Sequence, residues 1–159
     1  MQAPVAPVES IYRSHGPLVL RRARRILGNE DESREVLQEI FLALLNDPSQ
    51  LPREIPVTAW LYGVTTHKCL NRLRDVRTRA RLVDERAKSE DEPAPPSAPA
   101  KIAARDFLGE LPEELAKVAV FHFVDEMTHD EIATVLQCSR RRVGYLVEDV
   151  RARAKKRLG

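Results

Sequence analysis

A short proline-rich segment near the middle of the chain is the feature that most constrains how it can fold. The chain has 159 residues and eleven prolines, and four of these prolines lie within residues 93–99. Proline lacks the backbone N–H that helices and sheets require, so such a segment behaves as an exposed, semi-rigid linker and cannot build a core. We therefore expect two small domains, residues 8–84 and 103–159, joined by a linker at residues 85–102.

Apolar residues of the first domain recur at three- and four-residue spacings, which is the pattern of amphipathic helices. The spacing predicts helices over residues 8–27 and 30–46, and a third from residue 57 to beyond residue 74. Gly28 and Asn29 separate the first two helices, because glycine readily takes the left-handed conformation that ends a helix. The stripe of the second helix consists of Val36, Leu37, Ile40, Phe41, Leu44 and Leu45.

The second domain carries signals for helix starts. Residues 111–114 place a proline at a first helical position and acids in the first turn. Thr128 and Glu131 match a capping box, and Ser139 is a suitable N-cap for a last helix over residues 140–157. Because no strand pattern longer than a few residues occurs on either side of the linker, we expect an all-α fold of two small helical domains.

Composition narrows the possible functions. Apolar residues make up 43% of the chain and charged residues 31%, which excludes a disordered chain. No apolar run approaches the roughly 20 residues that cross a bilayer, and no secretion signal is evident, so we expect a cytoplasmic protein. The chain has no phosphate loop, paired-carboxylate site or nucleophile motif, so we expect neither enzyme activity nor a cofactor.

The cysteines and histidines do not form a recognisable metal motif. Cys69 and Cys138 lie far apart, as expected for reduced thiols. A zinc site from His122, His129 and Cys138 can be drawn, but the spacing is not that of a ligand set. We therefore expect no metal.

Charge is distributed unevenly along a chain whose net charge is only +2. Residues 12–25, 68–81 and 138–159 are rich in basic side chains, whereas residues 110–137 carry seven acids and one lysine. Such basic faces on a nearly neutral chain are typical of nucleic-acid binding proteins, although a solvated charged surface would give part of the same pattern.

Residues 130–147 have the pattern of a helix-turn-helix. Ala133 suits the position where the two helices approach closely, and Arg140, Arg141 and Arg142 follow at the start of the second helix. The N-terminal end of that helix enters the major groove, where arginine pairs with guanine edges. The residues expected to face inward are Ile132, Leu136, Cys138, Val143 and Leu146. The residues expected to contact DNA are Ser139, Arg140, Arg141, Arg142 and Tyr145.

The turn of this motif departs from the usual pattern. Glycine is usual at a position with positive φ, and this chain has Gln137 there, at a cost of about 1 kcal/mol. The alternative interpretation is a helical hairpin with a charged face.

Taken together, these motifs resemble the sigma-70 family of bacterial transcription factors. The C-terminal motifs are Leu111-Pro112-Glu113-Glu114-Leu115, Thr128-His129-Asp130-Glu131-Ile132-Ala133 and Ser139-Arg140-Arg141-Arg142-Val143. The N-terminal motifs are Ala23-Arg24-Arg25-Ile26-Leu27-Gly28-Asn29, Val36-Leu37-Gln38-Glu39-Ile40-Phe41 and Thr58-Ala59-Trp60-Leu61-Tyr62-Gly63-Val64. Two domains joined directly by a variable linker are similar to the layout of the extracytoplasmic-function (ECF) group.

The resemblance implies a function and partners. A sigma factor binds core RNA polymerase, recognises promoter DNA and helps to open it, and it is often held by an anti-sigma factor. On this chain the second helix would dock on polymerase through Glu35, Gln38, Glu39 and Phe41. The third helix would hold the minus-ten element through Trp60, His67, Lys68, Asn71, Arg72 and Arg74. The C-terminal domain would read the minus-thirty-five element.

Several residues leave alternatives open. Phe41 and Trp60 could simply be core aromatics. His67 stands where the family often has asparagine, and Glu148 and Asp149 stand where it usually has basic or neutral residues. The turn at Gln137 and the acids Glu148 and Asp149 would be explained by a second hypothesis, a sigma-like protein with weakened promoter reading that acts mainly by binding polymerase or a regulator. A third hypothesis, a plain helix-turn-helix regulator, does not explain the first domain.

Overall fold

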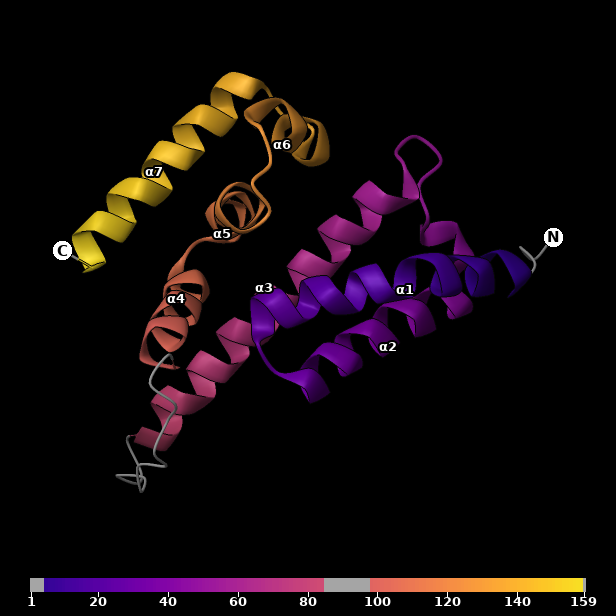
Figure 1. The fold of residues 1–159 in the computed structure, drawn as a ribbon, viewed down its shortest axis with the longest axis horizontal. Coiled ribbons are helices and arrows are strands. Elements are labelled where there is room, and N and C mark those ends of the chain that lie inside the picture. Colours follow the sequence, from indigo (N-terminus) through magenta and orange to yellow (C-terminus); the bar gives the residue numbers. More distant parts are fainter. Residues whose placement is uncertain (1–4, 85–97, 159) are drawn as a thin grey trace. The chain divides into compact units, whose positions relative to one another are not determined.

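The computed structural model describes residues 5–84 and 98–158, and all regular structure within these ranges is helical (Figure 1). The expected all-α fold is therefore confirmed. The elements are α1 (Val5–Leu27), α2 (Glu30–Asn46), η1 (Pro48–Gln50), α3 (Val57–Asp84), α4 (Ala98–Glu110), α5 (Glu113–Ala119), η2 (Val120–Val124), α6 (His129–Leu136) and α7 (Arg140–Leu158). None of the described helices is long and apolar enough to cross a membrane.

The chain forms two compact units, residues 1–69 and 70–159, and the division between them lies inside α3. We had placed the division at residues 85–102, and α4 begins within that range, at Ala98. Helix α3 extends to Asp84 because no proline or glycine interrupts it after Gly63. The domain limits at residues 84 and 103 stay a prediction.

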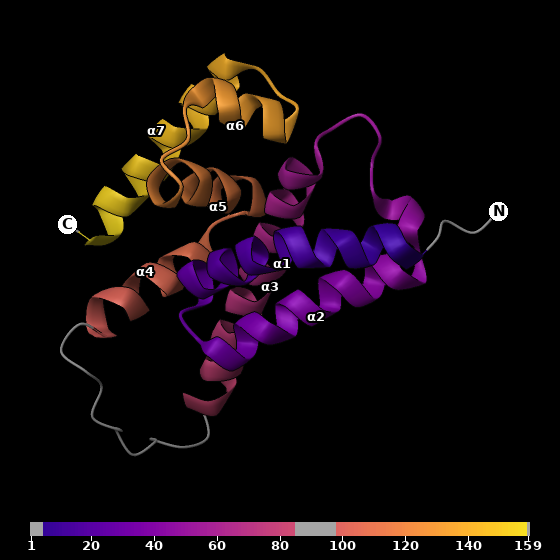
Figure 2. The same cartoon turned by 45° about the vertical axis from the view of Figure 1, so that its right-hand side comes forward.

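In the first unit, α1 and α2 lie side by side (Figures 1 and 2). Gly28 has φ 65 and ends α1, and the Asn29 side chain caps α2 by accepting a hydrogen bond from the Glu32 backbone N–H. The predicted stripe of α2 is buried except at Leu45, which is 45% exposed because it lies at the edge of the stripe near the helix end. The buried residues of the α1–α2 pair include Val19, Ala23, Ile26, Val36, Ile40 and Leu44.

In the second unit, α5, η2, α6 and α7 surround one apolar core, with α7 packed against both α5 and α6 (Figure 2). Its fully buried members are Val118, Phe121, Ile132, Val143 and Val147. Ile132 and Val143 were predicted to face inward, and the other predicted residues, Leu136, Cys138 and Leu146, are partly buried and pack against this core. Val147 and Val150, which were not predicted, are buried because they continue the face of Val143 one and two turns along α7.

Candidate functional site

The helix-turn-helix consists of α6, a tight turn and α7. Thr128 caps α6 in a capping box with Glu131, as predicted: its hydroxyl accepts from the Glu131 N–H at 3.1 Å. Ser139 caps α7 by accepting from the Arg142 N–H at 3.1 Å. Local side-chain chemistry therefore determines where both helices begin.

Gln137 takes the left-handed conformation at the turn, with φ 55°. This is the position at which we predicted that any residue other than glycine would be strained. The following N–H, of Cys138, donates to the Ala133 carbonyl at 3.0 Å and closes the end of α6. Cys138 itself is partly buried against the apolar core. The turn is thus formed without glycine, and the strain at Gln137 is offset by the packing on either side of it.

The arginines at the start of α7 are exposed and have different partners. The Arg142 guanidinium donates to both carboxylate oxygens of Glu114, on α5, at 2.9 and 2.8 Å. The Arg141 guanidinium donates to the Tyr145 hydroxyl through two nitrogens, each at 3.3 Å. Arg140 lies 3.7 Å from an Asp130 carboxylate oxygen. Five predicted DNA-contacting residues, from Ser139 to Tyr145, thus lie together in the first two turns of one helix.

The acids Glu148 and Asp149 are paired within α7. Glu148 contacts Arg151 and Asp149 contacts Arg153, each at 3.0 Å. Viewed down the axis of α7, with 3.6 residues per turn, the Glu148 side chain projects within about 60° of Arg141 and Tyr145. Glu148 therefore lies on the same outward face of α7 as these two residues. This acid therefore shares the face that we predicted to contact DNA.

The predicted polymerase-contacting residues lie on α2. Glu35, Gln38 and Glu39 are exposed, and a Glu39 carboxylate oxygen lies 3.8 Å from the Lys68 ammonium. Phe41 is buried, with 4% of its surface exposed, and its ring packs edge-on against Tyr12 with centroids 5.1 Å apart. Its burial favours the core interpretation for the greater part of the Phe41 side chain.

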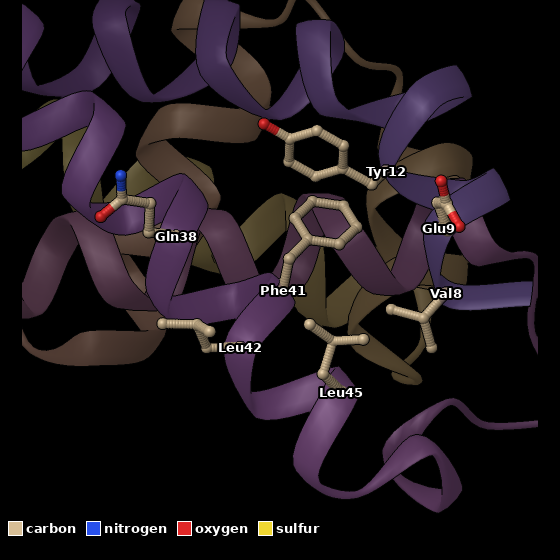
Figure 3. A pocket seen from close by; sticks show the side chains of 7 residues that line it. All are labelled: Val8, Glu9, Tyr12, Gln38, Phe41, Leu42 and Leu45. Atoms are coloured by element: carbon tan, nitrogen blue, oxygen red, sulfur yellow. The ribbon is translucent and has the colours of Figure 1, made fainter. Parts of the chain in front are cut away.

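An apolar groove that we did not predict lies beside these residues, between α1 and α2 (Figure 3). It encloses about 490 Å³, and Leu42 and Leu45 on its wall are 57% and 45% exposed. Its lining residues are Val8, Glu9, Tyr12, Gln38, Phe41, Leu42 and Leu45. The signal in the sequence was Leu42, an apolar residue outside the buried stripe of α2.

The predicted minus-ten residues lie on α3, and all of them are half-buried: Trp60, His67, Lys68, Asn71, Arg72 and Arg74. The half-burial of Trp60 is compatible with a core role and with an interface role. The Arg74 guanidinium donates to the Leu111 carbonyl at 3.1 Å, within the second unit, so one of its donors is engaged in the protein.

Arg22 on α1 belongs to the basic stretch of residues 12–25, but its side chain is buried. It is 4% exposed, and its guanidinium donates to the Thr66 hydroxyl at 3.0 and 2.7 Å. The same guanidinium lies over the Tyr62 ring, 4.4 Å from its centroid, in a cation–π contact. The Thr66 hydroxyl in turn donates to the Tyr62 carbonyl at 2.7 Å. Arg22 therefore fixes the first part of α3 against α1.

An ion pair also ties the end of α1 to the start of α2. The Arg24 guanidinium donates to the two Glu30 carboxylate oxygens at 2.5 and 2.6 Å. This hydrogen bonding lowers the pKa of Glu30 to about 2 and raises the pKa of Arg24. A carboxylate at this position also faces the positive end of the α2 dipole.

Two of the three residues of the conceivable zinc site come together. The His122 and His129 rings have centroids 5.3 Å apart. Within residues 5–84 and 98–158, no group of three or more histidine, cysteine or acidic side chains is arranged to hold a metal ion.

Two family models match the chain, one in each half of the sequence. The family model for sigma-70 region 2 matches residues 11–79, and the model for sigma-70 region 4 matches residues 101–158. No curated protein sequence matches the chain.

Two solved structures have the same fold. CnrH, in complex with the cytosolic domain of CnrY, matches with a TM-score of 0.56 and 20% identity, covering 98% of this chain and 90% of that chain. The sigma factor RpoE, in complex with the anti-sigma factor NepR from Bartonella quintana, matches with a TM-score of 0.52 and 15% identity, covering 94% of this chain and 95% of that chain. These similarities support the fold of the whole chain.

Proposed function

The chain belongs to the sigma-70 family of non-enzymatic transcription initiation factors, and from this premise we propose that it binds core RNA polymerase, recognises a promoter and helps to open it. The observation that carries the proposal is the presence of region 2 and region 4 in this order, which is the layout that we predicted for the ECF group. The domain limits remain those expected from the sequence, residues 8–84 and 103–159. The protein would act in the cytoplasm, where polymerase is found.

We propose that the polymerase contact is centred on Gln38. Its side chain is exposed on α2, at the rim of the apolar groove and close to Glu35 and Glu39 (Figure 3). A helix of polymerase that carries apolar and basic residues would find an apolar groove and acidic side chains on one face. Phe41 would contribute through the part of its ring that lines the groove.

The minus-ten element would contact α3. Its basic residues would neutralise phosphates, and Trp60 would stack on an unpaired base, which offsets the cost of opening the duplex. His67, Lys68, Asn71, Arg72 and Arg74 complete the proposed surface. The Arg74 guanidinium already donates to the Leu111 carbonyl, and the Lys68 ammonium lies 3.8 Å from a Glu39 carboxylate oxygen, so each would exchange a contact in the protein for one with DNA.

The minus-thirty-five element would contact the first two turns of α7. Ser139, Arg140, Arg141, Arg142 and Tyr145 lie there, and arginine at this end of a reading helix forms bidentate contacts with guanine. An arginine that is already paired with a carboxylate of the protein has less positive charge to offer to DNA, so the partners of each arginine matter for this contact.

An anti-sigma factor is a further proposed partner. The RpoE structure is a complex with an anti-sigma factor, and the CnrH structure is a complex with CnrY. We propose that an anti-sigma factor also binds this chain and keeps it from polymerase.

Run-off transcription with core polymerase tests the proposed function. The reconstituted enzyme should start transcription at promoters from the genome that encodes this chain, and core enzyme alone should not. A protein that binds core polymerase but starts transcription from none of these promoters would overturn promoter recognition.

Gln38→Ala tests the polymerase contact. We expect core affinity to fall several-fold while the melting temperature is unchanged, because Gln38 is exposed. Gln50→Ala is the matched control, since Gln50 is an exposed glutamine outside the groove. Equal core affinity in Gln38→Ala and the parent chain would contradict the assignment.

The second candidate function is that of a sigma-like protein with weakened promoter reading, which acts mainly by binding polymerase or a regulator. Glu148 favours it, because this acid lies on the same face of α7 as Arg141 and would repel phosphates. Core binding without promoter-dependent initiation would support this candidate. Glu148→Gln should then increase duplex affinity.

A further inference from the structure

The three consecutive arginines that open α7 point in three different directions. Successive residues of an α-helix are rotated by about 100°, so Arg140 and Arg142 lie on opposite flanks of Arg141. Val143, Val147 and Val150 define the buried face of α7, and Arg141 lies nearly opposite that face. The three arginines therefore cannot make equivalent contacts with one DNA groove.

Arg142 lies on the flank of α7 that faces α5. Its two hydrogen bonds to Glu114, at 2.9 and 2.8 Å, form a bidentate arginine–carboxylate pair, whose two parallel hydrogen bonds fix the geometry of both side chains. The pair joins the start of α7 to the first turn of α5 at the surface of the second unit, where the two side chains are 55% and 46% exposed. The Arg142 charge is compensated there, and the Nε/Nη2 edge of its guanidinium is occupied.

Arg141 has a different environment. Its guanidinium is bonded to the Tyr145 hydroxyl one turn along the same helix, and Tyr145 is 64% exposed. The acceptor of these hydrogen bonds is a neutral hydroxyl, so the positive charge of Arg141 is available to a ligand in front of α7. Because the Tyr145 hydroxyl already orients the Arg141 guanidinium, Arg141 loses less side-chain entropy when it binds a ligand.

Arg140 lies on the remaining flank, beside α6. The distance of 3.7 Å to Asp130 is too long for a hydrogen bond, and both side chains are more than two-thirds exposed, at 71% and 74%. Such a pair is weak and is readily replaced by a phosphate contact.

We propose that Arg142 is a positioning residue, which fixes the reading helix on α5 through Glu114, and that Arg141, supported by Tyr145, determines base specificity. Arg140 then supplies a phosphate contact. The inference rests on the proposed function, because it assigns different roles in the minus-thirty-five contact to Arg140, Arg141 and Arg142, which have the same chemistry in the sequence.

A charge-swap experiment tests the positioning role. Holoenzyme reconstituted from the full chain is used to select duplexes from a library randomised over the upstream promoter element. Arg142→Glu should lower affinity for all sequences, and the double variant Glu114→Arg with Arg142→Glu should restore most of it by rebuilding the pair in reverse. If Arg142 contacts DNA, the glutamate at residue 142 would repel phosphate in both variants, and no restoration would occur.

The selected sequences test the specificity role. Arg141→Ala should reduce the discrimination between the preferred base and the other bases at one position by about 5- to 150-fold. Arg142→Ala should leave the selected sequence unchanged and lower affinity by about two- to fivefold. Its slope of log affinity against log salt should also stay unchanged, whereas loss of a phosphate contact would reduce the slope by about 1.

The outcomes separate the inference from the proposed function. A parent holoenzyme that enriches no sequence overturns the proposed function, and the inference with it. A parent that enriches a sequence, with Arg142→Ala relaxing the preference at one position, overturns the inference alone. Melting temperatures of all variants control for folding, and an acid at residue 142 is tolerated near the positive end of α7.

Discussion

The two units hold their proposed DNA-contacting helices in different ways. In the first unit, a cation fixes α3 from inside: Arg22 is 4% exposed and is bonded to Thr66. In the second unit, an apolar core holds α7 from inside, and its cation–carboxylate pair lies outside, with the Arg142 side chain 55% exposed. A buried guanidinium has a high desolvation cost, so removing its partners is strongly destabilising. An exposed ion pair contributes little free energy, so it can be broken or replaced at small cost. We infer that α3 is held in one orientation, while the orientation of α7 can be tuned by surface substitutions.

The largest effect should come from the apolar core of the second unit. Phe121 is fully buried at its centre, so Phe121→Ala should lower the free energy of unfolding by about 3–5 kcal/mol. Phe123→Ala is the control, because Phe123 is 47% exposed and should change stability far less. Urea unfolding followed by circular dichroism measures both. Similar losses in the two variants would mean that the core does not hold α7 as described.

The next effect tests the buried cation. Arg22→Met keeps the length of the side chain but removes the donors to Thr66, and should cost about 1–3 kcal/mol. Arg21→Met is the matched control, since Arg21 is exposed and should change stability by less than about 0.5 kcal/mol. The measurement is the urea midpoint of the full chain. A more stable Arg22→Met variant would show that desolvation of the guanidinium outweighs its contacts, and the contrast between the units would then disappear.

A smaller effect, of opposite sign, is expected at the turn before α7. Gln137 has φ 55, so Gln137→Gly should stabilise the second unit by about 0.5–1 kcal/mol. The control is Gln38→Gly in the middle of α2, where glycine should instead cost about 1 kcal/mol. Thermal unfolding of both variants distinguishes turn strain from a general effect of glycine. A destabilised Gln137→Gly variant would show that contacts of the glutamine side chain outweigh the backbone strain.

The smallest effect is a pH dependence confined to the first unit. The pKa of Glu30 is lowered to about 2 by hydrogen bonds from Arg24, so it lies below its value in the unfolded chain. Its contribution is therefore fully present above the ordinary carboxyl pKa and is lost as the pH falls towards 2. The difference in urea midpoint between pH 7 and pH 3 should be smaller in Glu30→Gln than in the parent chain. Identical differences would show that the pair with Arg24 does not form in solution.

Much of the fold could be predicted from local patterns. The limits of α2, the capping box at Thr128 and the N-cap at Ser139 follow from side chains that act on their own backbone. Gln137 was identified as the strained position because a helix-turn-helix requires positive φ there. These features depend on residues within about one helical turn of each other, and short-range chemistry is what a single sequence records.

The sites were predicted less completely. The α2 residues Glu35, Gln38 and Glu39 are exposed, and their contact with polymerase stays a prediction. The groove beside them was missed because α1 supplies one of its walls. Val147 and Val150 are buried on α7 and were not among the residues expected to face inward. Which residues of α7 are fully buried depends on where α5 and α6 lie against it.

By itself, the sequence determined the helical class, the starts of α2, α3, α6 and α7, and the family to which the chain belongs. Only the tertiary structure decided which arginines are available to DNA. Arg22 and Arg21 are neighbours of identical chemistry, yet one is buried beneath α3 and the other is exposed. Arg141 and Arg142 are likewise identical in sequence terms, and Glu114, 28 residues before Arg142, separates their roles. The physical reason is that a guanidinium's charge is set by its chemistry, whereas its freedom to bind is set by the groups that folding places around it.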